Sequence, residues 1–162
     1  MFEYFKLIGS GPNDLSAAIH GGLGIILLAA FIWAVEAVLN KSPEAFKRLK
    51  IGSIVMAVSS FLTIIYGNII YIAYRAKDGV QPWLKDNNIY WFHTLGMEFK
   101  EFAALFSFPL AIAIAYTLFT MSEDWFKSDW ARKTVKISLF IAIFFTFGAF
   151  ILGAAVTKAK AI

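Results

Sequence analysis

The hydrophobic positions of this chain fall into four long runs separated by short polar stretches. The runs cover residues 17–39, 51–74, 95–121 and 135–156. A helix needs about 20 mostly apolar residues to cross a bilayer, so each run is long enough to span one. We therefore predict an all-α fold, an integral membrane four-helix bundle of up-down-up-down order that forms a single transmembrane domain over residues 1–162.

The polar stretches contain signals for helix ends and turns. Ser42 followed by Pro43 is typical of a capping serine before a proline at the first helical position. The longest connection, residues 75–88, contains Asp78-Gly79 and other turn-forming pairs, and it is the loop most suited to docking a partner. Pro109 lies inside the third run, where it predicts a kink.

Composition supports a membrane environment. The 162 residues are 59% hydrophobic and only 16% charged, with a mean hydropathy of +0.67. Aromatic residues make up 17%, as expected of a chain that packs rings against lipid, other rings or a flat cofactor. The chain has no cysteine, which excludes disulfides, iron–sulfur clusters and thiolate-bound metals.

The positive charges favour one orientation. Eight Lys and Arg residues crowd into the two short loops, against seven on the other side. Lys and Arg concentrate in the short loops on the cytoplasmic side of a membrane. We therefore predict a multi-pass protein of the cell (inner or plasma) membrane with both termini outside. The net charge of +4 is explained by these loop residues, which set the orientation in the membrane. We therefore predict the lipid bilayer, and not a nucleic acid, as a partner.

Two histidines are the strongest candidates for cofactor chemistry. His20 lies near the start of the first run and His93 near the start of the third helix. These helices run parallel and stand diagonally across a four-helix bundle, so both imidazoles lie toward the same membrane face. Two imidazoles that face each other can bind haem iron as its axial ligands. We therefore predict His20 and His93 as the cofactor-binding and metal-binding residues. Tyr71 and Arg75, at the same end, are candidates for binding the haem propionates.

Helix register counts against a shared haem. Measured from the opposite helix ends, His20 and His93 differ in depth by roughly 12 Å at about 1.5 Å per residue. A kink at Pro109, a tilt or a shifted span would be needed to bring them level. Met97, one turn from His93, is an alternative axial ligand.

A second polar group consists of Glu98, Lys100 and Glu101. Glu98 and Glu101 are one helical turn apart, and a carboxylate inside a membrane can relay protons to a quinone. The alternative is that all three side chains lie in the headgroup region as a solvated start of the helix. A metal site built from His20, Glu98 and Glu101 is a further hypothesis, because imidazole and carboxylate suit iron, zinc or manganese.

In size, number of spans and the placement of His20 and His93, the chain resembles small four-helix membrane b-type cytochromes. The resemblance implies that a haem b passes electrons between quinol and redox subunits in the membrane or at its outer face. Members of that family often bind two haems with four or more histidines. This chain has two histidines, which allow one bis-histidine haem at most.

The predicted function is that of a membrane subunit in a respiratory-type electron-transfer complex. It would be an enzyme only as part of a membrane oxidoreductase, with Glu98 or Glu101 accepting the quinol proton. Two alternatives remain: a cofactor-free structural subunit of a larger complex, and a small transporter whose path includes Asn68. The common catalytic motifs for nucleotide binding, serine hydrolysis and zinc proteolysis are absent from the sequence.

Overall fold

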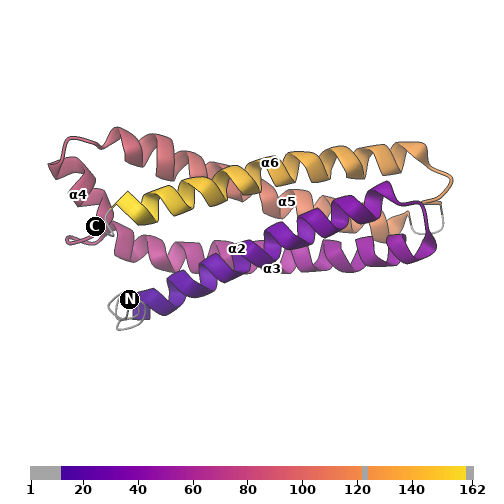
Figure 1. The fold of residues 1–162 in the computed structure, drawn as a ribbon, viewed down its shortest axis with the longest axis horizontal. Coiled ribbons are helices and arrows are strands. Elements are labelled where there is room, and N and C mark those ends of the chain that lie inside the picture. The colour runs from indigo at the N-terminus through magenta and orange to yellow at the C-terminus, as the bar shows by residue number, and fades with distance from the viewer. Residues whose placement is uncertain (1–11, 122–123, 160–162) are drawn as a thin grey trace, which may run out of the picture.

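The chain forms an all-helical bundle, as predicted. A computed structural model describes residues 12–121 and 124–159, and no strand occurs among them. Four of the helices are long and apolar enough to cross a membrane. The elements, shown in Figure 1, are α2 (Pro12–Leu39), α3 (Pro43–Arg75), α4 (Val80–Asp86), a π-helix (His93–Glu98) that continues into α5 (Phe99–Thr120), and α6 (Asp129–Ala159).

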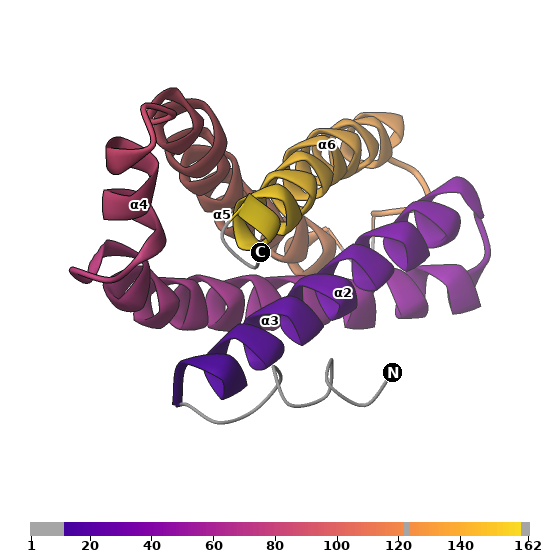
Figure 2. The same ribbon diagram turned by 60° about the vertical axis from the view of Figure 1, so that its left-hand side comes forward.

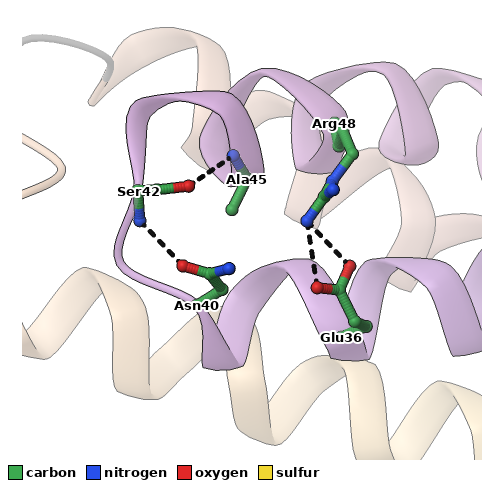
Figure 3. A network of polar contacts seen from close by, with 5 residues as sticks. All are labelled: Glu36, Asn40, Ser42, Ala45 and Arg48. Carbon is green, nitrogen blue, oxygen red and sulfur yellow. Dashed lines mark hydrogen bonds and ion pairs between the residues drawn. The ribbon is translucent and has the colours of Figure 1, made fainter.

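The turn between α2 and α3 is fixed by local polar contacts. The Ser42 hydroxyl accepts a hydrogen bond from the Ala45 amide at 3.1 Å, and Pro43 occupies the first turn, so the predicted cap is confirmed. The Asn40 side chain accepts from the Ser42 amide at 3.1 Å (Figure 3). One turn further into each helix, Arg48 donates to the carboxylate of Glu36 at 2.9 and 3.0 Å.

The four long helices pack so that α2 and α5 are diagonal to each other. The main neighbours of α2 are α3 and α6, and those of α5 are also α3 and α6. This is the predicted placement of the first and third helices. Large apolar side chains from all four helices fill the core, among them Leu27, Phe31, Leu49, Met56, Ile114 and Leu139. Many other apolar side chains point outward, as expected in lipid.

The long connection contains a helix as well as turns. Where the sequence predicted only turns, α4 forms a short helix at one end of the bundle (Figures 1 and 2). Gly79 precedes it, and a Cβ there would lie 2.3 Å from the Tyr74 carbonyl oxygen, so only glycine fits the turn. Leu84 is fully buried and anchors α4 to the bundle.

The third span begins as a π-helix and continues as an unbroken α-helix. The π-helix covers His93–Glu98, and α5 runs through Pro109 without a break in helical structure. The predicted kink at Pro109 stays a prediction. Between α5 and α6 the buried hydroxyls of Ser107 and Thr146 are 2.7 Å apart, which joins the two helices in the middle of the bundle.

Candidate functional site

His93 lies at the centre of a hydrogen-bonded cluster at the α4 end of the bundle. Its side chain is 2% exposed. Nδ1 lies 2.9 Å from the hydroxyl of Tyr74 on α3, and Nε2 lies 3.1 Å from the side-chain nitrogen of Gln81 on α4. Both ring nitrogens therefore have protein partners, as a buried polar side chain requires.

The hydrogen bonds around Gln81 fix the roles of the histidine nitrogens. Arg75 Nε donates to Gln81 Oε1 at 3.4 Å, which assigns the other end of the amide as the donor. Gln81 Nε2 donates to the Tyr90 hydroxyl at 3.3 Å and to His93 Nε2. His93 Nε2 is then an acceptor, so neutral His93 carries its proton on Nδ1 and donates it to Tyr74.

Glu98 favours the other tautomer of His93, with the proton on Nε2. The Glu98 carboxylate lies 3.5 Å from His93 Nε2, and its side chain is 55% exposed. A carboxylate only accepts, so it favours a proton on Nε2, whereas Gln81 favours a lone pair there. Two competing partners on one nitrogen allow a proton to move between the buried ring and the exposed carboxylate.

The π-helix is the reason that His93 and Glu98 meet. In an α-helix, residues five apart point to different faces, because one turn takes 3.6 residues. A π-helix pairs residue i with residue i+5, which brings these two side chains to the same side. Short π-segments occur frequently at functional sites, so the local geometry and the polar cluster point to the same place.

Aromatic rings enclose the cluster. Tyr74 stacks on Tyr71 with ring centres 5.6 Å apart and on His93 at the same separation. Tyr90 packs against His93 at 5.0 Å, and the Arg75 guanidinium lies 5.2 Å from the centre of the Tyr71 ring. Tyr71 and Arg75, predicted as propionate ligands, thus contact the His93 cluster directly or through one neighbour.

His20 lies apart from this cluster. Its Nδ1 donates to the backbone carbonyl of Thr63 on α3 at 2.9 Å. The ring packs over Gly67, where a Cβ would lie 3.1 Å from His20 Cε1. The nearby Gly21 and Gly22 face open space, since a Cβ at either position would meet no atom of the described chain within 4 Å.

In this arrangement the two histidines lie at different depths and contact different partners. His20 packs on Gly67, and His93 contacts Tyr74, seven residues further along α3 and about 10 Å away at 1.5 Å per residue. A bis-histidine haem needs one nitrogen of each ring on the same iron, and both nitrogens of His93 are already bonded. Haem ligation by His20 and His93 stays a prediction that these contacts do not fit.

The remaining candidate residues lie at two depths along the axis of the bundle. Met97 is buried against Tyr74 and Val156, beside the His93 cluster. Lys100 and Glu101 lie about two turns deeper, half-buried, and within electrostatic reach of each other. Among residues 12–121 and 124–159, no three His, Asp or Glu side chains could hold one metal ion, so the hypothetical site of His20, Glu98 and Glu101 is wrong.

The sequence did not indicate the two residues that hydrogen-bond to His93. Tyr74 and Gln81 carried no motif, and Gln81 comes into contact only because α4 folds over the end of the bundle. Tyr74 lies three residues after Tyr71 and one before Arg75, so the neighbourhood was indicated, although the residue was not. Asn68, proposed for a transport path, instead donates to the Ile64 carbonyl of its own helix at 3.1 Å.

Comparison with known protein families, curated proteins and solved structures found no match to this chain.

Proposed function

We propose that the chain is a membrane subunit of a quinone-linked electron-transfer complex, and that the His93 cluster carries the proton released when a quinol is oxidised. The observation that supports this proposal is the buried His93 ring, held between the Tyr74 hydroxyl and the Glu98 carboxylate. Such a chain of groups moves protons without moving large charges through the bundle.

The relay works through the two tautomers of His93. When His93 donates from Nε2 to Glu98, Nδ1 accepts the Tyr74 proton, and the Tyr74 oxygen accepts the proton of the quinol hydroxyl. The quinol O–H bond breaks, the Nε2 proton passes to Glu98, and the electron leaves to a one-electron acceptor in a partner redox subunit. Gln81 then stabilises the tautomer with the proton on Nδ1.

Glu98 is placed to exchange that proton with water. Its carboxylate is half exposed, whereas the ring it contacts is fully buried. Counting 20 residues back from Thr120, about 30 Å of helix, reaches Lys100, so Glu98 lies at the edge of the hydrocarbon layer. A carboxylate there avoids the cost of a charge at the bilayer centre.

The test is infrared difference spectroscopy on the detergent-purified chain, with a short-chain quinone oxidised and reduced at an electrode. Oxidation of the quinol should protonate Glu98 and change the imidazole bands of His93. Glu98→Gln should remove the carboxyl signal and His93→Gln the imidazole signal. Glu36→Gln is the matched control, because Glu36 is equally exposed, at 54%, at the opposite end of the bundle.

Two results would contradict the proposal. One is a carboxyl signal that persists in Glu98→Gln or disappears equally in Glu36→Gln. The other is a low-spin b-type band in the reduced-minus-oxidised visible spectrum that is lost in both His20→Ala and His93→Ala. Such a band would support the bis-histidine haem instead. Both histidines would then have to break the hydrogen bonds described above.

A cofactor-free structural subunit is the second candidate, and the outer face of α5 and α6 favours it. Phe102, Phe106 and Phe144 are exposed there, and Phe106 stacks on Phe145 at 5.2 Å. A rigid aromatic face suits packing against another membrane helix. The infrared experiment separates the two candidates, because a structural subunit shows no quinone-dependent change at Glu98.

A further inference from the structure

A second polar site lies one level deeper than the His93 cluster, where side chains from α2 and α5 cross the neighbouring helices. His20 projects from α2 onto Gly67 of α3, and Lys100 projects from α5 onto Gly153 of α6. The Lys100 ammonium lies within electrostatic reach of the His20 ring. Neither residue takes part in the relay described above.

Glycines provide the space for both side chains. A Cβ at Gly67 would lie 3.1 Å from His20 Cε1, and a Cβ at Gly153 would lie 3.1 Å from Lys100 Cε. Both separations are tighter than ordinary van der Waals contact, so any larger residue would push the polar side chain aside. By contrast, a Cβ at Gly148, also on α6, would meet nothing within 4 Å.

His20 presents a lone pair to the site. The Thr63 carbonyl oxygen can only accept, so the proton of neutral His20 must be on Nδ1. Nε2 is then an acceptor, and the described residues show no hydrogen bond to it. The anchoring bond holds the ring in one orientation, as second-shell bonds do for functional histidines.

Lys100 supplies the complementary donor. It lies at the edge of the hydrocarbon layer, where an ammonium group requires a partner. Glu101 is within electrostatic reach, but that carboxylate is also within reach of Arg75 and Glu98. Among the side chains described over residues 15–121 and 124–156, none forms a hydrogen bond or close ion pair with Lys100, so its three N–H donors can be offered to a ligand.

We infer that His20 and Lys100 bind one hydroxyl of a membrane hydroquinone. A hydroxyl donates to His20 Nε2 and accepts from the Lys100 ammonium, which a phosphodiester headgroup, lacking a donor, cannot do at neutral His20. The inference rests on the proposed function and deepens it by naming the site that binds the quinol headgroup.

The spacing of the two sites fits a ring with hydroxyls at opposite ends. Gly67, under His20, and Tyr74, which bonds to His93, are seven residues apart on α3, or about 10 Å. A six-membered ring with para hydroxyls offers one hydroxyl to each of the two sites, and Tyr71 and Met97 pack against Tyr74 beside them. The offset that separates the histidines for haem thus suits a quinol.

The experiment is equilibrium dialysis of a short-chain benzoquinol against the full chain in lipid nanodiscs. We expect Lys100→Met and His20→Leu to weaken binding at least about tenfold, since each loses a hydrogen bond to a charged or buried group. Lys50→Met is the matched control, because Lys50 is also half-buried and lies at the opposite end of the bundle. It should bind the quinol as the unaltered chain does.

Two glycine variants test whether weaker quinol binding results from loss of folding. Gly153→Ala should displace Lys100 and weaken binding several-fold, whereas Gly148→Ala should leave binding unchanged, with unfolding temperatures recorded for both. Equal binding by the unaltered chain, Lys100→Met and His20→Leu would overturn the inference while leaving the His93 proposal intact. No binding by the unaltered chain would overturn both.

Discussion

The two ends of the bundle both carry charged side chains, but they place them differently. At the α2–α3 turn, the Glu36 and Arg48 side chains form an ion pair in which both partners are about half exposed. At the other end, His93 is buried and bonded at both ring nitrogens. The first arrangement costs little and contributes little, whereas the second needs every partner in place. The charges at the turn lie at helix ends, whereas those at the α4 end surround a buried ring, which is the group that the proposed proton relay uses.

Removal of His93 should have the largest effect on stability. His93→Ala leaves the Tyr74 hydroxyl without its buried partner, removes one of two acceptors of the Gln81 amide and opens a cavity, so we expect a loss of about 2–4 kcal/mol. Thermal unfolding in one detergent, compared with the unaltered chain, measures it. A loss no larger than that of Arg48→Ala would mean that the two ends are equivalent.

Crowding under His20 should have the next largest effect. Gly67→Ala should cost about 1–2 kcal/mol, because the new methyl group displaces the ring and strains its bond to Thr63. Gly22→Ala is the control, since its Cβ meets nothing within 4 Å and alanine favours a helix. If Gly67→Ala were as stable as Gly22→Ala, the ring would not be held in place by the close approach of α3.

The cap at the turn should contribute a moderate amount. Ser42→Ala removes the acceptor for the Ala45 amide and should destabilise the chain by about 1 kcal/mol. Ser42→Asp, which retains a side-chain acceptor, should unfold close to the unaltered chain. The same melting experiment tests both, and equal losses in the two variants would rule out capping as the cause.

The exposed ion pair should contribute least. Glu36→Gln and Arg48→Gln should each change stability by less than about 1 kcal/mol, and their coupling in a double-mutant cycle should be about 0.5 kcal/mol. The coupling should fall as salt is raised, because exposed charges are screened. A coupling above about 2 kcal/mol, insensitive to salt, would remove the contrast between the two ends.

The sequence predicted the bundle because the signals for it are local. Twenty apolar residues in a row indicate a span wherever they occur, and Ser42 with Pro43 marks a helix start without reference to the rest of the chain. The fold class and the diagonal placement of the first and third helices followed from these signals. The predicted start of α3 at Pro43 is confirmed, whereas α6 begins at Asp129, six residues before its apolar run, because polar residues extend the helix.

The candidate site was only partly predictable, because its contacts are not local. His93 and Glu98 were both singled out, but a regular helix places residues five apart on different faces, so their meeting depends on a π-helix that periodicity does not reveal. Gln81 reaches His93 only through the fold of α4, in a stretch expected to form turns. The depth difference between the histidines was also predicted, and His20 packs on Gly67 whereas His93 bonds to Tyr74, seven residues further along α3.

The π-helix also has a consequence for how the third span tolerates change. A segment with i to i+5 hydrogen bonds holds one residue more than an α-helix that follows the same path. It can therefore lose one residue without breaking the helix. Deleting one residue between His93 and Glu98 would let the segment relax to a regular helix. His93 and Glu98 would then lie four residues apart and still share one face, while Tyr90 and the Ser107–Thr146 contact kept their register. The surplus residue is therefore what lets two side chains five apart in this sequence lie on one side, while the helical segments before and after it keep the faces they present to the bundle.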